Sequence, residues 1–310
     1  MSAKESVSIG LSAAIVAVEA DRPSVLVVAH GGSEDALPFG PFAPAQHRTL
    51  ESGLRKWVGE QTKFDLGYTE QLYTFGDKGR HTGGGGRVVS VGYLALTRLG
   101  REAPGTQWRG WYHYFPWEDW RDAKPAMIET TILPALKKFA KDAPNAETAE
   151  LRRERINVCF GEGWDEERVL ERYELLYEAG LVEEFYRDSG KAAKGQRLGT
   201  PMLFDHRRIL ATAIARLRGK LKYRPVVFEL MAPTFTLLEL QRVVEALAGL
   251  RLHKQNFRRL VAEQGLVEGT GKYSAPARGR PAELFHFRRD VLRERPTPGM
   301  RLGVRRGKLS

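Results

Sequence analysis

The chain has 310 residues and a formal charge of +11, with 42% hydrophobic and 28% charged residues. This composition excludes a wholly disordered chain and a collagen-like repeat, and the length suits two domains or a large domain with a small one. The charge is uneven, because residues 223–310 hold 17 basic and 8 acidic side chains whereas residues 1–222 hold 32 and 30. A basic terminal module on a nearly neutral body indicates a polyanion-binding domain joined to a domain of another kind.

The single cysteine, Cys159, excludes an intrachain disulfide framework and any multi-cysteine metal centre. Its apolar neighbours Val158 and Phe160 favour a packed small hydrophobe over a nucleophile. No apolar run reaches the ~18 residues that a membrane span needs. Apolar residues alternate from Val7 to Ile15, which is typical of a strand and not of a signal peptide. We therefore expect a cytoplasmic protein with no membrane partner.

Strands dominate the predicted structure of the first 120 residues. Two strands are expected within 7–30, around a turn at 20–24, and single strands at 66–75, 87–97 and 108–115. One helix is expected at 45–62, where an apolar stripe at helical spacing is formed by Leu50, Leu54, Trp57 and Val58. The first domain is therefore predicted to be α+β.

Helices are expected to replace strands from Pro125 onward. One is predicted at 165–179, with acidic residues at its start and Gly180 at its end, and another at 206–221. A glycine-containing loop is predicted at 189–200. The segment 223–225 then separates these helices from the basic module.

The basic module opens with a strong helix-start signal. Thr236 and Glu239 form a predicted capping box, Phe235 and Leu240 occupy the two positions of a hydrophobic staple, and Gly249 is placed to end the helix. After a short turn, a second helix is predicted at 253–264. Two short helices joined by a tight turn indicate a helix-turn-helix.

The second helix has an inward apolar face, Phe257, Leu260 and Val261, and an outward polar face. A strand at 266–268, a basic loop at 269–281 and a strand at 282–287 complete a predicted winged helix-turn-helix. The predicted DNA-contacting residues, whose donor groups suit base edges and phosphates, are Lys254, Gln255, Asn256, Arg258, Arg259, Lys272, Arg278 and Arg280. The alternative is a solvated basic hairpin that only packs or dimerises. The order of elements and the local charge favour DNA binding, and the basic tail at 288–308 could add phosphate contacts.

Several segments, taken in order, resemble the Nudix-related transcriptional regulators of bacterial NAD metabolism, the NrtR/NadQ type. They are 40–62 with HRTLE at 47–51, EQLYTFGD (70–77), RVVSVGYL (87–94), 204–220 beginning with FDHRRIL, and the winged-helix segments FTLLEL (235–240), NFRR (256–259) and GRPAELF (279–285). No single motif is highly specific, but their order is. The resemblance implies a Nudix-like α/β/α sandwich over residues 1–222, with a helical insertion at about 121–200, followed by a winged helix-turn-helix domain with a basic tail over 223–310.

The resemblance also bears on catalysis, because a Nudix hydrolase needs several glutamates on one helix to hold divalent metal against a pyrophosphate. Alignment places Trp57, Glu60 and Gln61 at the three metal-glutamate positions, with lysines replacing the motif's arginine and final glycine. A one-residue shift recruits Lys56, Gly59 and Glu60 instead and again keeps one carboxylate. We therefore expect no catalytic residue, no metal site and no efficient hydrolysis.

A nucleotide-binding function for the same domain follows from the resemblance. The predicted effector-binding residues are Arg48, Arg55, Arg80 and Arg87 for phosphates, Trp57, Tyr73 and Phe75 for stacking, and Glu60. Each could equally be a core aromatic or a solvated charge. The implied effector is ADP-ribose, NAD or a related nucleotide, and no cofactor is expected to be required.

The preferred hypothesis is a homodimeric repressor of genes for NAD synthesis or salvage, which binds a palindromic operator in double-stranded DNA and responds to the nucleotide. The rival hypothesis is a Nudix-type pyrophosphohydrolase with an accessory basic domain. RNA binding is less favoured, because the chain lacks the aromatic sheet signature of an RNA-recognition motif.

Overall fold

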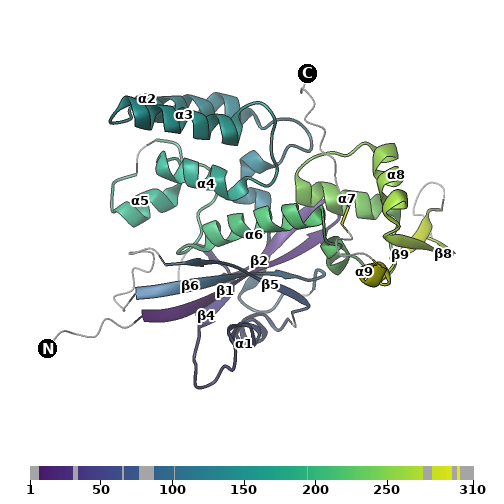
Figure 1. The fold of residues 1–310 in the computed structure, drawn as a ribbon. Helices are drawn as coiled ribbons and strands as arrows, with labels where there is room; N and C mark the ends of the chain where they lie inside the picture. The colour runs from purple at the N-terminus through teal and green to yellow at the C-terminus, as the bar shows by residue number, and fades with distance from the viewer. Residues whose placement is uncertain are drawn as a thin grey trace.

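The protein is described from a computed structural model, which covers residues 7–30, 34–64, 66–76, 87–100, 102–193, 195–274, 281–294 and 299–300 (Figure 1). The strands are β1 (Val7–Glu19), β2 (Arg22–Ala29), β3 (Asp35–Ala36), β4 (Phe39–Pro41), β5 (Tyr68–Phe75), β6 (Arg87–Leu96), β7 (Thr106–Gly110), β8 (Val267–Tyr273) and β9 (Glu283–Phe287). The α-helices are α1 (Leu50–Thr62), α2 (Leu133–Lys141), α3 (Ala146–Phe160), α4 (Val169–Glu178), α5 (Glu183–Ser189), α6 (His206–Leu221), α7 (Leu237–Ala248), α8 (Lys254–Gln264) and α9 (Val291–Glu294). Short 3-10 turns lie at Trp111–His113, Pro116–Glu118 and Val226–Leu230, and a π-helical turn lies at Ile128–Ile132.

The larger sheet is organised around β1. This strand runs parallel to β6, from Val7 opposite Arg87 to Val16 opposite Leu96, and antiparallel to β2 and β4. β5 extends the sheet beyond β6, and β7 extends it beyond β2. Helix α1 covers one face and α6 covers the other, as Figure 1 shows. We call the described residues up to Leu221 the sandwich domain; its α/β/α arrangement confirms the predicted fold class.

The apolar sequence of β1 follows from its central place. Leu11, Ala13 and Ile15 pack in the cluster under α1, whereas Ala14 and Val16 pack in the cluster under α6. Both faces of the strand are buried, so successive side chains on either side must be apolar. Residues 11–17 are therefore buried on both faces of the sheet, and the strand has no face toward solvent over this stretch.

Helix α1 begins later than predicted. Its N-cap is Thr49, whose side chain accepts a hydrogen bond from the backbone of Ser52 while Ser52 returns one to the Thr49 backbone. This capping box fixes the first turn at Leu50, so residues 45–49 are outside the helix. The helix ends at Lys63, which has a left-handed backbone (φ 59°).

The predicted strand at 108–115 is wrong in its second half. Strand β7 ends at Gly110, and two 3-10 turns follow. Trp111, Tyr114, Phe115 and Trp117 are all fully buried in the core on the α6 side. A strand would have sent alternate residues to opposite faces, whereas the turns direct all four aromatic rings to one core.

The helical insertion, α2 to α5, forms further layers beyond α6 (Figure 1). Helix α4 packs on α6, and α3 packs on α4 and on α2. Buried arginines of α6 connect that helix to these layers: Arg207 pairs with Glu184 of α5, and Arg208 pairs with Glu174 of α4. Helix α4 starts at Val169 and not at the predicted residue 165, because the preceding residues form a turn whose carbonyl at Asp165 accepts from Arg172.

The described residues of 226–294 form what we call the winged module, whose buried side chains continue the core on the α6 side of the sandwich domain. Its helices α7 and α8 stand against the β8–β9 hairpin, and Phe228 stacks on Phe287 with ring centroids 4.3 Å apart. Beyond α9 the chain returns to the sandwich domain, where the buried Met300 donates its N–H to the Leu221 carbonyl (3.0 Å). Within the ranges that the structure describes, no helix is both long and apolar enough to cross a membrane.

Candidate DNA interface and effector site

The start of α7 is built as the sequence predicts. The Thr236 side chain accepts from the Glu239 N–H (3.2 Å), and the Thr236 N–H donates to the Glu239 carboxylate (2.7 Å). Phe235 and Leu240, the two staple residues, are both buried. Phe235 also pairs through its backbone with Phe285 of β9. The capping box and the backbone pairing of Phe235 with β9 therefore fix the position where α7 begins.

Two buried polar residues of α7 fix the turn that leads to α8. Glu245 accepts from the Leu252 N–H (2.9 Å) and from Gln241 Nε2 (2.8 Å), and Gln241 also donates to the Leu252 carbonyl (2.9 Å). Sequence reasoning missed both residues. The available signal was a polar pair four residues apart on the otherwise apolar inward face of a helix. Because the N–H and the carbonyl of Leu252 are both bonded to α7, the direction in which α8 leaves is set by α7.

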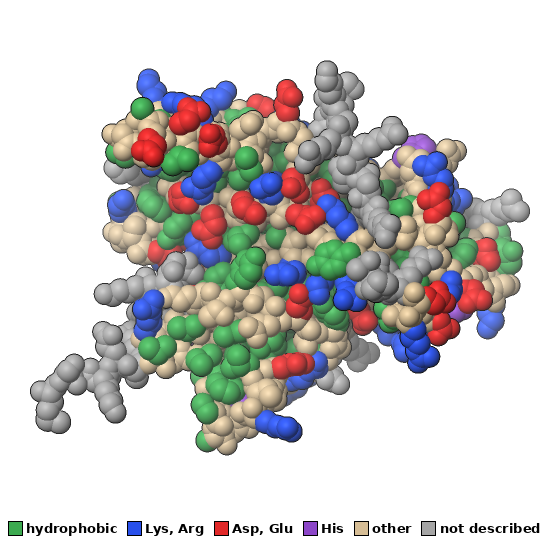
Figure 2. Space-filling model, viewed as in Figure 1, with side chains coloured by type: hydrophobic (Ala, Val, Ile, Leu, Met, Phe, Trp, Pro, Cys, Tyr) green, Lys and Arg blue, Asp and Glu red, His purple; other side chains and the backbone are tan. Residues whose placement is uncertain are grey.

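Helix α8 presents its polar side chains to solvent. Phe257 and Val261 are buried, whereas all five predicted DNA-contacting residues of the helix are exposed: Lys254, Gln255, Asn256, Arg258 and Arg259. Arg259 lies 3.8 Å from Glu263 in an exposed pair, which contributes little to stability. Figure 2 shows Lys and Arg side chains on the winged module, at the right of the view, with acidic side chains among them. The predicted division of the helix into two faces is thus present.

The wing contributes further exposed positions. Lys272 is exposed on β8, next to Tyr273, whose side chain is 64% exposed. The β8–β9 pairing shifts register between Gly269 and Tyr273, which changes the course of the hairpin before its tip. The predicted residues Arg278 and Arg280 lie outside the described residues.

On the sandwich domain, Arg55 is held by internal bonds. Its guanidinium donates to the Glu51 carboxylate, to the Thr69 hydroxyl (3.1 Å), and to the carbonyls of Leu66 and Gly67. The Arg55 and Thr69 hydrogen bonds lower the pKa of Glu51 below its usual value. Arg55 therefore fastens α1 to the start of β5.

Two residues at the metal-glutamate positions of the Nudix alignment hold a neighbouring strand instead. Trp57 donates its indole N–H to the Pro41 carbonyl (2.8 Å), and its ring lies against Gly40 so closely that a Cβ there would be 2.2 Å from the ring. Gln61 accepts from the Phe39 N–H (3.1 Å) and donates to the Phe39 carbonyl (2.7 Å). Glu60, the third position, is exposed.

The remaining predicted effector residues are spread over several surfaces. Arg48 is exposed just before α1, whereas Arg87 donates to the Gly76 carbonyl at the end of β5 (2.6 Å). Tyr73 is 53% exposed near Arg216 of α6, and Phe75 is buried in the core on the α6 side. Arg80 lies outside the described residues. The described residues of the predicted effector set thus do not meet at one point.

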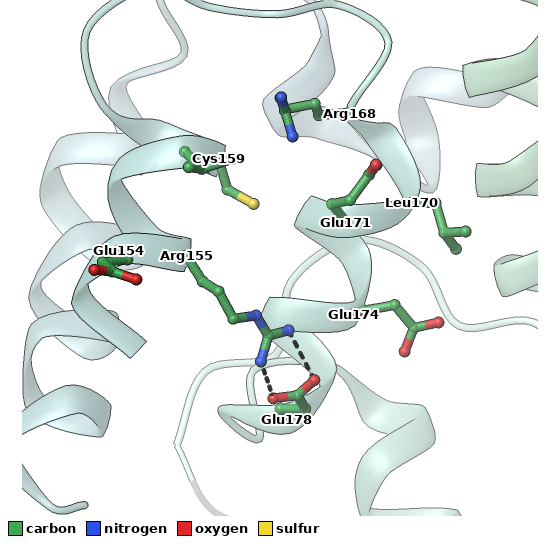
Figure 3. Close-up of a pocket in the computed structure, with 9 residues that line it drawn as sticks. Glu154, Arg155, Cys159, Arg168, Leu170, Glu171, Glu174 and Glu178 are labelled. Atoms are coloured by element: carbon green, nitrogen blue, oxygen red, sulfur yellow. Dashed lines mark hydrogen bonds and ion pairs between the residues drawn. The ribbon is translucent and has the colours of Figure 1, made fainter. Parts of the chain in front are cut away.

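A hollow of about 610 Å³ lies elsewhere, between α3 and α4 of the insertion (Figure 3). Arg155 pairs across it with Glu178 (2.6 and 2.8 Å), and Cys159 faces it from α3. Burial raises the pKa of the Cys159 thiol. None of the residues predicted for DNA or effector binding lines this hollow. Among the described residues, no group of three or more His, Cys, Asp or Glu side chains is arranged to hold a metal ion.

Comparison with known families identifies the winged module. Residues 227–287 match the family model of the NrtR DNA-binding winged helix domain. The module is a winged helix domain of the NrtR type. All eight predicted DNA-contacting residues fall inside the matched range of this NrtR-type domain.

Relatives and solved structures extend the comparison. The chain is 44% identical over 92 residues to the "ADPR responsive transcriptional repressor NtrR" of Acinetobacter baylyi, an alignment that covers 30% of this chain and only 36% of that protein. The structure of Shewanella oneidensis NrtR with a 27mer DNA superposes with a TM-score of 0.55 at 21% identity, over 91% of this chain and 94% of that one. A MutT/nudix family protein from Enterococcus faecalis gives a TM-score of 0.52 at 17% identity, over 93% and 89% of the chains. Over the 91% that superposes, the chain therefore shares the fold of NrtR, a Nudix-like sandwich followed by the NrtR-type winged helix.

Proposed function

We propose that this protein is a DNA-binding transcriptional repressor of genes for NAD synthesis or salvage, and that a nucleotide bound to its sandwich domain controls it. The observation that carries the proposal is a helix, α8, that exposes five polar side chains within a winged helix domain of the NrtR type. In this proposal the nucleotide-sensing domain spans residues 1–222 and the DNA-binding domain spans 223–310. A regulator of this kind acts in the cytoplasm, where the bacterial DNA lies.

DNA recognition is assigned to α8 and the wing. Arg258, Arg259 and Lys254 supply charged donors for phosphates and guanines, and Gln255 and Asn256 supply the paired donor and acceptor that suit adenine. Lys272 of β8 is proposed to contact the flanking backbone, and the sequence-predicted contacts Arg278 and Arg280, which lie outside the described residues, are proposed to do the same. A homodimer would place two α8 helices on the half-sites of a palindromic operator.

The effector is proposed to be ADP-ribose, NAD or a related nucleotide, in line with the name of the Acinetobacter baylyi relative. Arg48, Tyr73 and Glu60 are exposed on the sandwich domain and available to a ligand. Arg55 is bonded to the Leu66 and Gly67 carbonyls and Arg87 to the Gly76 carbonyl, so a phosphate would compete with these contacts. The proposed set also includes Trp57, Phe75 and Arg80. Because Phe75 is buried in the core on the α6 side, it would contact a ligand only after a rearrangement, and the indole N–H of Trp57 is already bonded to Pro41.

We propose further that the sandwich domain binds its nucleotide without efficient hydrolysis and requires no cofactor. A Nudix-type metal site needs carboxylate oxygens from α1, but Trp57 and Gln61 carry none and are bonded to the segment 39–41. The other carboxylate of α1, Glu51, accepts hydrogen bonds from Arg55 and Thr69, and Glu60 by itself cannot neutralise and fix two Mg²⁺ ions. The residues present therefore do not fit the family's metal.

The test is an anisotropy titration of the full chain against DNA upstream of neighbouring NAD genes, with and without ADP-ribose, NAD or ATP. We expect sequence-specific binding that one NAD-related nucleotide changes and ATP does not. No specific binding under any of these conditions would overturn the proposal.

A second assay addresses catalysis. With Mg²⁺ and a series of nucleotide diphosphates, we expect no turnover above that of the chain without metal. Substantial turnover would instead favour a pyrophosphohydrolase with an accessory basic domain.

A further inference from the structure

A buried ionic cluster lies where the sandwich domain meets the winged module. The Glu118 carboxylate accepts from Arg172 of α4 (2.6 and 2.9 Å) and from Arg218 of α6 (2.7 Å). All three side chains are 0% exposed. Two guanidinium groups thus share one carboxylate in a site without solvent, and carbonyl groups must satisfy their remaining N–H donors.

Some of those carbonyl groups belong to the last turn of α7. Arg218 donates through Nε to the Leu247 carbonyl (2.9 Å), the Tyr112 hydroxyl donates to the Ala246 carbonyl (2.7 Å), and the Trp120 N–H donates to the Gly249 carbonyl (2.8 Å). The last carbonyls of a helix have no partner within the helix, and a cation is favourable at that end. All three donors belong to the sandwich domain or its insertion. We call this contact between Tyr112, Glu118, Trp120 and Arg218 and the end of α7 the joint.

The joint packs closely around Gly249, the residue that ends α7. Gly249 has a left-handed backbone (φ +73°), and a Cβ there would lie 2.5 Å from the Glu118 carbonyl oxygen and 2.9 Å from the Tyr112 hydroxyl. Five residues later α8 begins, after the turn that Gln241 and Glu245 hold against α7. Any rotation of α7 at the joint is therefore passed on to the recognition helix.

Helix α6 connects the joint to the sheet. Its Lys220 pairs with Glu70 of β5 (2.7 Å), and its Arg216 lies over the ring of Tyr73, 5.9 Å from the centroid. Arg218, between them in sequence, enters the joint. A shift of β5 on effector binding would thus move α6, the helix whose Arg218 is bonded to the end of α7.

We infer that the joint sets the orientation of α8 relative to the sandwich domain, and that Arg218 is a positioning residue through which nucleotide binding alters DNA affinity. This inference rests on the proposed function. It assigns the coupling between the two sites to one buried contact, which is distinct from the residues that touch DNA or nucleotide.

The test uses a wedge at the joint with a matched control. Gly249→Ala introduces a methyl group into the joint, whereas Gly190→Ala adds one at the end of α5, where φ is +64° and no heavy atom of the described chain lies within 4 Å. Both changes impose the same kind of left-handed strain. Glu118 is left intact, because removing it would bury two unpaired guanidinium groups and threaten folding.

The first readout is the ratio of DNA dissociation constants with and without ADP-ribose, which for a coupled regulator is on the order of 5- to 150-fold. We expect Gly249→Ala to bring the ratio close to 1 while nucleotide binding persists, and Gly190→Ala to keep the ratio of the unchanged protein. Tyr112→Phe, which removes the bond to Ala246 without adding bulk, should lower the ratio by less. If Gly249→Ala does not fold, the ratio measured for Tyr112→Phe tests the inference instead. A wild-type ratio in a folded Gly249→Ala protein, or failing that in Tyr112→Phe, overturns the inference.

The second readout needs neither DNA nor effector. Spin labels are placed at the exposed positions 137 and 263 as Lys137→Cys and Glu263→Cys, with Cys159→Ser removing the native thiol. We expect a narrow distance distribution in the otherwise unchanged protein and in Gly190→Ala, and a broader or shifted one in Gly249→Ala. Equal distance distributions in all three proteins would contradict the inference that the joint fixes the orientation of α8. A protein that binds no DNA would overturn the proposed function, but this measurement would still decide whether the joint fixes α8.

Discussion

Helices α1 and α8 are both amphipathic, but they use their polar side chains in opposite ways. Five predicted DNA-contacting residues lie on α8. Of their side chains, only that of Arg259 has an ion-pair or hydrogen-bond partner within the described part of the chain, the exposed Glu263. On α1, Arg55, Trp57 and Gln61 are bonded to β4, to β5 or to the segment before β5. Donors that face solvent are available to a new partner at no structural cost, whereas donors bonded internally stabilise the domain. The polar residues of α8 therefore suit recognition, and those of α1 suit architecture.

The largest expected effect comes from removing exposed donors of α8, the helix that this comparison assigns to recognition. Arg258→Ala together with Arg259→Ala should weaken operator binding by about 2–6 kcal/mol, since each good base contact is worth about 1–3 kcal/mol. Nucleotide binding should be unchanged, because neither side chain supports the fold. Anisotropy titrations measure the first quantity and calorimetry the second. Lys137→Ala with Lys138→Ala removes equal charge from α2, and an equal loss of DNA affinity there would show that only net charge matters.

The next effect tests whether α7 directs α8. Glu245→Ala should lower the free energy of unfolding by about 1–3 kcal/mol, because it leaves the Leu252 N–H without its acceptor. DNA affinity should fall as well, although Glu245 touches no DNA. Chemical denaturation and the same titration measure the two changes. Glu263→Ala, on the exposed side of α8, should change stability by no more than about 0.5 kcal/mol; a comparable loss in both variants would contradict the assignment.

The architectural side is tested by restoring a carboxylate. Gln61→Glu keeps an acceptor for the Phe39 N–H but loses the donor to the Phe39 carbonyl. We expect the free energy of unfolding to fall by about 1–3 kcal/mol, with no gain of Mg²⁺-dependent hydrolysis. Thermal melts and a phosphate-release assay check both. Glu60→Gln on the exposed side of α1 serves as the control, and a stable, active Gln61→Glu protein would show that α1 is a metal-binding helix.

The smallest effect concerns the wing. Lys272→Ala should reduce the slope of log K against log salt by about 0.9, the change expected when one phosphate contact is lost. Relative affinities for different operator sequences should stay the same. Titrations at several salt concentrations measure the slope. A change in sequence preference at constant slope would mean that Lys272 reads bases.

Local signals in the sequence predicted local structure well. The capping box at Thr236 and the helix-ending residues Gly249 and Gly265 depend on neighbours a few positions away, and all three are present. The paired roles of Trp57 and Gln61 were missed, because their partners are backbone groups of the segment 39–41, which only the folded sheet brings under α1. The joint was missed for the same reason, since Arg218 and Glu118 are 100 residues apart in sequence. The 3-10 turns after β7 were missed because their cause is a shared core and not a local propensity.

The return of the chain to its point of departure has a consequence for how the protein can change. The chain leaves the sandwich domain at Leu221, and Met300 comes back to bond with the same residue. Everything between them is a closed excursion whose two ends lie together, the arrangement in which domains are most readily exchanged or inserted. Close termini alone do not make this segment exchangeable, because α7 packs on β1, β2 and α6 and accepts hydrogen bonds from Tyr112 and Arg218. A replacement segment would have to supply the same carbonyl acceptors and the same apolar face.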